Sequence, residues 1–155
     1  MDEALFDFSI TGTIEPPPAP EISVFLGSSN TGSTIADSQP EPIDVGSTML
    51  ETDLIQTFAI ENTGTLPLNV SSISITGTDY TVNSTINTIG AGTTETFAVT
   101  LSAANPGTFN ATVTITSDDL DEGEFTYPIT GVVLGLSVIE GENTNGDVLI
   151  SNEEV

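Results

Sequence analysis

The stretch that decides the fold is "TFAVTLSAANPGTFNATVTITSDDLDEGEFTYPITG", Thr96 to Gly131. Apolar residues alternate with Thr, Ser and Asn in three short runs, which is the period of a strand that buries one face. Turn-forming residues, including Pro106-Gly107, separate the runs. The apolar positions on the shared faces are Phe97, Val99 and Leu101, then Val113 and Ile115, then Phe125, Tyr127 and Ile129.

The same alternation continues on both sides of this stretch, with turn residues roughly every ten positions and almost no helix signal. This pattern predicts an all-β chain folded as an antiparallel β-sandwich. The expected strands are Leu5–Ile10, Ile22–Leu26, Ile55–Ile60, Leu68–Ile75, Tyr80–Val82, Thr96–Leu101, Thr108–Thr116, Glu124–Thr130 and Leu136–Ile139.

Two segments near the start of the chain recur near its end. "DEALFDFSITG", Asp2 to Gly12, matches "DEGEFTYPITG", Asp121 to Gly131, at six of eleven positions. "ISVFLGSSNTG", Ile22 to Gly32, is echoed by "LSVIEGENTNG", Leu136 to Gly146. The first pair is offset by 119 residues and the second by 114, so the chain has the form of a window cut from a tandem repeat.

The repeat divides the chain into four parts. Residues 1–12 are the closing strand of a preceding repeat, and residues 13–19 are a linker made stiff and extended by consecutive prolines. Residues 20–131 form one complete sandwich. Residues 132–155 are a second linker and the first strands of a following repeat.

The complete repeat resembles the immunoglobulin-like repeats of the ASPM–SPD-2–Hydin type, and most of all their bacterial secreted relatives, the "choice-of-anchor D" proteins. The likeness rests on "PEISV" (Pro20–Val24), "QTFAIENTGTLPLNVSSISITG" (Gln56–Gly77), "IGAGTTETFAVTLSAANPGTFNATVTITSDD" (Ile89–Asp119) and "FTYPITG" (Phe125–Gly131). It implies an immunoglobulin-like fold in a large exported surface protein, with no catalytic residue. Within it, Asn62 and Gly64 are expected in a turn after a strand.

The charge balance excludes several partners. The 155 residues contain 23 acidic side chains and no Lys, Arg or His. Nothing can neutralise a phosphate, so nucleic acid and anionic membrane surfaces are excluded. No stretch approaches the ~20 apolar residues of a membrane span, so no membrane insertion is expected. Together with the richness in Thr, Ser, Asn and Gly, this composition favours an extracellular or cell-surface location.

Catalysis lacks its usual parts. Without His, Cys, Lys or Arg, the chain cannot build a serine triad, a thiol nucleophile or a phosphoryl-transfer site. Paired carboxylates could hydrolyse glycosides, but there is no Trp and there are only two Tyr to form a sugar platform. We therefore expect no enzyme and no catalytic residue.

One loop offers hard oxygen ligands at a density that suits calcium, and we expect no other cofactor. The alternative is a solvated hairpin loop whose carboxylates avoid one another. The candidate ligands are Asp118, Asp119, Asp121, Glu122 and Glu124.

The expected partners are neighbouring copies of the same sandwich, with divalent cations as further candidates. An apolar strand with no host domain needs cover from outside the complete repeat, either from the adjacent copy of a continuous array or by strand exchange between subunits. The candidate contact residues are Leu5, Phe6, Phe8, Ile10, Leu136 and Val138.

The sequence thus favours a structural repeat of an extracellular bacterial filament, stalk or large surface protein, assembled head to tail. The alternative is an adhesive module that binds a glycan or a partner protein through loops at a sandwich end. The candidate loops are Thr76–Asp79, Asn83–Gly92 and Ser117–Gly123. Sparse aromatic residues weaken this alternative, because binding anchors are typically Trp, Tyr or Arg.

Overall fold

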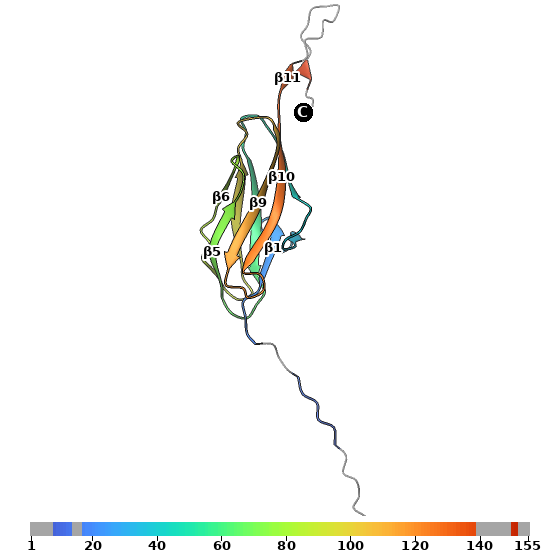
Figure 1. The fold of residues 1–155 in the computed structure, drawn as a ribbon, viewed down its shortest axis with the longest axis vertical. Helices are drawn as coiled ribbons and strands as arrows, with labels where there is room; N and C mark the ends of the chain where they lie inside the picture. Colours follow the sequence, from blue (N-terminus) through green and yellow to red (C-terminus); the bar gives the residue numbers. More distant parts are fainter. Residues whose placement is uncertain (1–7, 14–16, 139–149, 152–155) are drawn as a thin grey trace, which may run out of the picture.

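The computed structural model of the protein describes residues 8–13, 17–138 and 150–151. Two five-stranded sheets pack face to face, and a separate two-stranded ladder follows them (Figure 1). One sheet has the order β2-β1-β4-β8-β6 and comprises Ser33–Ile35, Ile22–Leu26, Leu54–Asn62, Thr94–Leu101 and Tyr80–Asn83. The other has the order β3-β10-β9-β5-β7 and comprises Ile43–Met49, Glu124–Leu134, Gly107–Ser117, Leu68–Ile75 and Thr88–Ile89.

The all-β sandwich expected from the sequence is confirmed, and the described residues contain strands but no helix. In that part of the chain nothing therefore has the length and apolar character of a membrane-spanning helix. β1 and β5 have the predicted bounds, and the other central strands differ from prediction only at their ends. Four strands were not predicted: β2, β3, β7 and β12 (Ile150–Ser151). β2, β7 and β12 have only two or three residues each, and β3 is an edge strand in which only Val45 is buried, so their alternation carries little signal.

The strand pairing departs from the antiparallel prediction at one place. β3 runs parallel to β10, with Ile43 opposite Ile129 and Met49 opposite Leu134, whereas the other strand pairs are antiparallel. The chain crosses from β2 in one sheet to the edge of the other between Ile35 and Ile43, and so enters β3 in the direction of β10. Sequence periodicity does not report strand direction, so this pair could not be predicted.

The glycine of the "ITG" motif does not end its strand. β10 continues through Gly131 to Leu134, and Val133 is buried in the core, so the predicted end at Thr130 was wrong. A Cβ on Gly131 would lie 2.9 Å from a Leu101 methyl carbon and 2.9 Å from the Tyr80 hydroxyl. The glycine is needed because β10 passes close over packed side chains, which is a common reason for glycine inside a strand.

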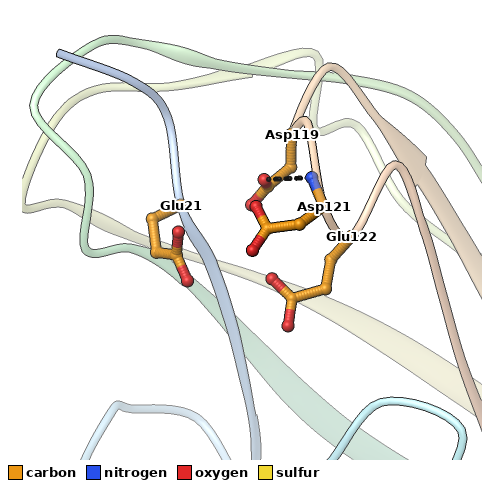
Figure 2. Close-up of side chains that lie close together, drawn as sticks. All are labelled: Glu21, Asp119, Asp121 and Glu122. Atoms are coloured by element: carbon orange, nitrogen blue, oxygen red, sulfur yellow. Dashed lines mark hydrogen bonds between the residues drawn. The ribbon is translucent and has the colours of Figure 1, made fainter. Parts of the chain in front are cut away.

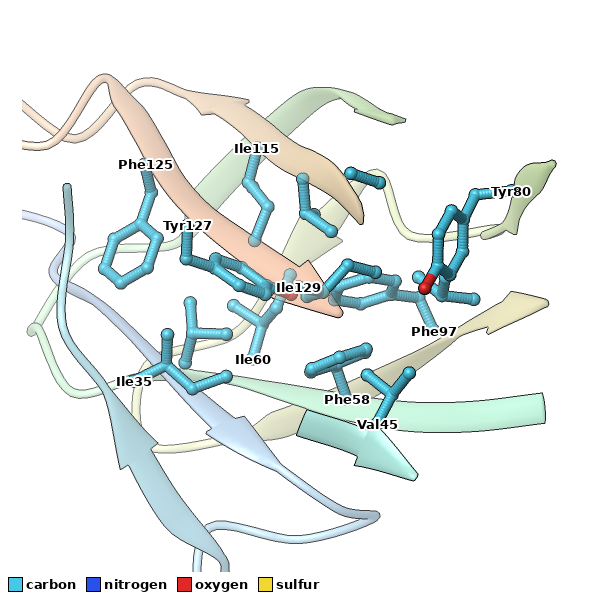
Figure 3. Close-up of a cluster of buried hydrophobic side chains, with 14 of the residues drawn as sticks. Ile35, Val45, Phe58, Ile60, Tyr80, Phe97, Ile115, Phe125, Tyr127 and Ile129 are labelled. Carbon is cyan, nitrogen blue, oxygen red and sulfur yellow. The ribbon is translucent and has the colours of Figure 1, made fainter. Parts of the chain in front are cut away.

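The core lies between the two sheets and is built from the alternating positions (Figure 3). Phe58 stacks on Phe97 with ring centroids 5.5 Å apart and contacts Tyr127 at the same distance in a tilted arrangement. Tyr127 in turn meets Phe125 edge to face. Each large side chain that is fully buried contributes about 1.5–3 kcal/mol to folding. The apolar alternation seen in the sequence therefore accounts for the stability of the sandwich.

Two buried tyrosines differ in how their hydroxyl groups are satisfied. The Tyr80 hydroxyl donates a hydrogen bond to the Phe109 carbonyl oxygen at 3.0 Å. The Tyr127 hydroxyl is buried and has no hydrogen-bond partner among the described residues. Burial raises the pKa of Tyr80 to about 12, with a smaller contribution from Asp79, and raises that of Tyr127 further. Both hydroxyl groups therefore stay protonated, and only that of Tyr127 carries an uncompensated desolvation penalty.

We expect Y127F to raise the free energy of unfolding by about 1 kcal/mol, because it removes a buried polar atom without a partner. Y80F is the matched control and should lower the free energy of unfolding by about 1 kcal/mol through the lost hydrogen bond. Urea unfolding of both variants measures the difference. In the alignment of the two repeated segments, Phe8 takes the position of Tyr127, which agrees with phenylalanine being acceptable there. Equal destabilisation by both substitutions would contradict this description of the core.

Candidate functional site

The chain joins the sandwich at a buried asparagine, at an end that we call the linker end. Asn62 is fully buried at the end of β4. Its side-chain oxygen accepts hydrogen bonds from the backbone N–H of Glu21 at 3.2 Å and of Gly64 at 3.0 Å. Its amide nitrogen donates to the carbonyl oxygens of Leu66 at 2.7 Å and Ile89 at 3.0 Å. One side chain thus connects the incoming chain, the turn after β4 and the end of β7.

Backbone hydrogen bonds also hold residues 19–21 against the turn after β4. The Thr63 N–H donates to the Glu21 carbonyl oxygen at 2.8 Å, and the N–H groups of Thr65 and Leu66 donate to that of Ala19 at 2.8 and 3.2 Å. A Cβ on Gly64 would lie 2.3 Å from this Ala19 oxygen, so only glycine allows the approach. The turn predicted for Asn62 and Gly64 is therefore also an anchor for the linker.

Asp119 fixes the first residue of β1 through a hydrogen bond to its backbone. It lies in the loop between β9 and β10 and is only 5% exposed. Its Oδ2 accepts a hydrogen bond from the Ile22 N–H at 2.7 Å, and its Oδ1 accepts one from the Asp121 N–H at 3.4 Å. The buried carboxylate therefore acts first as a backbone acceptor, which is a structural use.

Four carboxylates gather around this point (Figure 2). Ligand oxygens of Glu21, Asp119, Asp121 and Glu122 all lie within 4.8 Å of one another. We call these four residues the acidic cluster. Three of them belong to the predicted calcium loop. Glu21 was missed, because it precedes β1 and only the sheet topology places it beside the loop between β9 and β10.

The other two predicted ligands lie elsewhere. Asp118 accepts hydrogen bonds from the Asn69 N–H at 2.7 Å and from the Asn69 side-chain amide at 2.6 Å. The side-chain hydrogen bond, followed by the backbone one, holds the pKa of Asp118 below its usual range. Glu124 is exposed at the start of β10, where it is opposite Thr116 in the ladder. Neither residue belongs to the acidic cluster.

The cluster is electrostatically unfavourable as long as its members are charged. Burial, and then the charges of Asp119 and Asp121, raise the pKa of Glu21. Burial, and then the charges of Glu21 and its neighbours, raise the pKa of Glu122, whose Oε2 atom is buried without a hydrogen-bond partner among the described residues. The chain has no Lys, Arg or His to offset these charges. Protons or bound cations can both relieve the repulsion.

The raised pKa values predict a melting temperature that is higher at pH 5 than at pH 7. Groups whose pKa is raised by folding stabilise the protein fully below their unfolded pKa, and this contribution is lost as the pH rises through the folded pKa. Glu21 and Glu122 are such groups. Asp118 has the opposite sign, so stability should fall again as the pH drops through its lowered pKa.

The variant E122Q should therefore melt at a higher temperature than the wild type at pH 7 and show a smaller gain at pH 5. E95Q is the matched control, because it also removes one charge but from the exposed face of β8, outside the cluster. Thermal melts at both pH values, in enough salt to screen long-range repulsion, measure the difference. The same response from both variants would assign the effect to net charge alone.

The predicted contact residues have mixed placements. Leu5 and Phe6 lie outside the described residues. Phe8 and Ile10 are 65% and 82% exposed, and the described part of their segment is not in a strand. Leu136 is 60% exposed and lies two residues after the end of β10. Val138 lies in β11 (Ser137–Val138), opposite Ile150 of β12 (Ile150–Ser151). Their role in contacts between copies stays a prediction.

The three loops of the adhesive alternative do not form one surface. The loops Asn83–Gly92 and Ser117–Gly123 both reach the linker end. There the Thr93 N–H donates a hydrogen bond to the Gly90 carbonyl oxygen, and the Asn69 carbonyl oxygen accepts one from the Asp118 N–H. Thr76–Asp79 lies at the opposite end, which we call the far end, where the Asp79 carbonyl oxygen accepts a hydrogen bond from the Ser102 N–H. A binding site that uses all three loops is therefore not formed within one sandwich.

The fold defines an immunoglobulin-like β-sandwich domain, in which the buried side chains of Asn62 and Asp119 anchor the domain's own backbone. The chain belongs to the family described as "Protein of unknown function (DUF1573)", which matches residues 31–133. No curated protein sequence matches the chain.

Solved structures share the fold at low sequence identity. A protein of unknown function from Porphyromonas gingivalis W83 is 14% identical, with a TM-score of 0.53 over 77% of this chain and 68% of that one. A family 123 glycoside hydrolase from Clostridium perfringens is 12% identical, with a TM-score of 0.55 over 76% of this chain but only 28% of the hydrolase. At such identities the likeness concerns the fold alone.

Proposed function

We propose that this chain is a structural repeat of an extracellular or cell-surface protein in which sandwiches follow one another head to tail. The observation that carries the proposal is the path of the chain. It enters the sandwich at the linker end and leaves β10 at the far end (Figure 1). A domain with its two connections at opposite ends extends a chain by its full length, which suits a spacer or stalk.

The hairpin after β10 supports a following repeat. β11 pairs antiparallel with β12, with Val138 opposite Ile150. β1 and β2 also pair antiparallel at the start of the sandwich, with Val24 opposite Ile35. The sequence echo aligns Val138 with Val24. Both echoed segments thus begin with a short antiparallel strand pair, which supports the proposal that a further repeat starts near Leu136.

The sheet topology favours a continuous array over strand exchange. The repeat aligns Leu5–Ile10 with the first half of β10. β10 is hydrogen-bonded on both sides, to β9 and to β3, so its place in the sheet is filled from within the same chain. A donated strand would have to displace β10. This supports the proposal that Leu5–Ile10 belongs to a separate, preceding sandwich.

The composition supports an exposed, non-catalytic role. Every one of the 23 charged side chains is acidic, so trypsin-like proteases have no site and like charges keep neighbouring fibres apart. The likeness to a glycoside hydrolase covers a minor part of that enzyme and brings no activity to this chain. Such a chain can hold another part of the protein away from the cell, or cover the cell surface, without a catalytic residue.

Divalent cations are the proposed partners of the acidic cluster. Carboxylate oxygens are the ligands that calcium prefers, and the cluster provides four carboxylates. Calcium at millimolar concentration is expected to raise the melting temperature above that in chelator, and E122Q should reduce this shift more than E95Q. A melt that is identical with calcium and with chelator would show a solvated acidic loop.

Small-angle X-ray scattering of the full-length protein tests the proposed spacer. The maximum dimension should approach the number of sandwiches multiplied by the length of one sandwich, because each repeat adds its long axis. A maximum dimension close to that of a compact cluster of the same mass would reject the head-to-tail arrangement. A glycan-array screen addresses the adhesive alternative, for which we expect no specific hit.

A further inference from the structure

We propose that the far end of this sandwich is a docking face for the sandwich that follows it. The two sandwiches are then in direct contact at this junction, whereas the linker separates the sandwiches at the linker end. The inference rests on the proposed head-to-tail arrangement and goes beyond it by naming the contact surface. The docking face consists of Met49, Leu50 and Leu134. Together with Glu51 and with Leu136, the first residue of the following sandwich, they line a hollow of about 320 Å³.

The first argument is the length of the connection. β10 ends at Leu134, and the sequence echo aligns Leu136 with Ile22, the first residue of β1. Only Gly135 lies between them. At the linker end, the position aligned with Leu134 is residue 15, so six residues, 16–21, bridge the corresponding gap. In an extended conformation, the five extra residues, which are rich in proline, would lengthen the connection between two sandwiches by roughly 15 Å.

The second argument is that Gly135 cannot act as a loose hinge. The Leu134 carbonyl oxygen accepts a hydrogen bond from the Leu50 N–H at 3.0 Å, which ties the end of β10 to the turn after β3. A Cβ on Gly135 would lie 3.1 Å from the Pro106 Cβ. The connecting residue therefore runs directly against the far-end loops, and a sandwich that begins at Leu136 has to lie against the same loops.

The third argument is the chemistry of the turn itself. Turns between strands usually carry Gly, Asn, Asp or Ser, yet this one presents Met49 and Leu50, which are 42% and 36% exposed. Glu51 adopts a φ of 68°, a left-handed conformation that is unfavourable for a residue other than glycine. Strained positions persist where the surrounding structure requires them. Burial of Met49 and Leu50 by a neighbour gives this turn a function.

The linker end provides a contrast within the same molecule. Its apolar hollow of about 660 Å³ is lined by Leu66, Pro67 and Leu120 and also by the chain's own Pro18, Ala19 and Pro20. The extended linker thus lies along the surface that a close neighbour would need. The preceding sandwich is held away by the linker, whereas the following sandwich docks directly.

Thiol labelling of the full-length protein tests the docking face, because these 155 residues contain no cysteine. L50C places a thiol on the docking face, and I55C places one on the side of β4, where Ile55 is 65% exposed. We expect a maleimide to label L50C at least tenfold more slowly than I55C. Insertion of the sequence of residues 16–20 after Gly135 should bring the two rates to within about threefold of each other.

Two results would overturn the docking face: labelling of L50C as fast as that of I55C, or slow labelling that the insertion leaves unchanged. Neither result would by itself reject the head-to-tail arrangement, which requires only that the chain continues from one sandwich to the next. An extended scattering profile combined with fast labelling would mean a flexible array. A compact profile would reject the arrangement itself.

Discussion

N62A is expected to lower the free energy of unfolding by about 4 kcal/mol, because the Asn62 side chain makes four hydrogen bonds worth about 1 kcal/mol each. The substitution also leaves buried groups without partners, including the carbonyl oxygen of Ile89. Domains are stable by only about 5–15 kcal/mol, so the loss is a large fraction of the total. The melting temperature should fall by roughly 10 °C.

The matched control for this prediction is N30A. The Asn30 amide also donates a hydrogen bond, to Glu61 at 2.8 Å, but the pair is exposed to water. This substitution should change the free energy of unfolding by less than about 0.5 kcal/mol. Denaturant unfolding monitored by circular dichroism gives both values. If N62A proved as mild as N30A, the linker would not be anchored through Asn62.

G64A is expected to lower the free energy of unfolding by about 3 kcal/mol, for a different reason. The new methyl group would overlap the Ala19 oxygen at 2.3 Å and the Glu21 nitrogen at 2.6 Å. Backbone atoms cannot move aside as flexible side chains do, so the linker segment has to detach. Detachment breaks the three backbone hydrogen bonds that join it to the turn after β4, each worth about 1 kcal/mol.

G12A is the control for this substitution, since nothing lies within 4 Å of a Cβ built at Gly12. A glycine-to-alanine change in open space alters stability only slightly. Hydrogen exchange adds a local readout. In G64A, the N–H groups of Thr63 and Thr65 should exchange faster, whereas those in the middle of β9 should change only with global stability. Unchanged protection at Thr63 and Thr65 would contradict the proposed joint.

The sequence was most informative where one face of a strand is buried. The alternation in Phe97–Leu101 and Phe125–Ile129 reported the core directly, because every second residue there is buried in it. β3 escaped prediction because it is an edge strand in which only Val45 is buried and Gly46 interrupts the apolar alternation. Its parallel pairing with β10 depends on where the chain crosses between the sheets, which alternation does not record.

The polar sites were predictable only in part, for a related reason. Asp119, Asp121 and Glu122 are close in sequence, so their density was visible, but Glu21 joins them only through the pairing of distant segments. Asn62 was recognised as a turn residue from its local sequence. Its role as an anchor depends on Glu21 and Ile89, which no local pattern connects to it. Local chemistry could be predicted, and the contacts between distant segments required the structure.

Electron microscopy of the native full-length protein tests the central claim most directly. The claim is that sandwiches of this kind follow one another head to tail, with connections at opposite ends. We predict rods or filaments in which each axial step is one sandwich, with short gaps at junctions like that after Leu134 and longer gaps at proline-rich junctions like that before Ile22. Single compact particles, or sandwiches packed side by side, would contradict it.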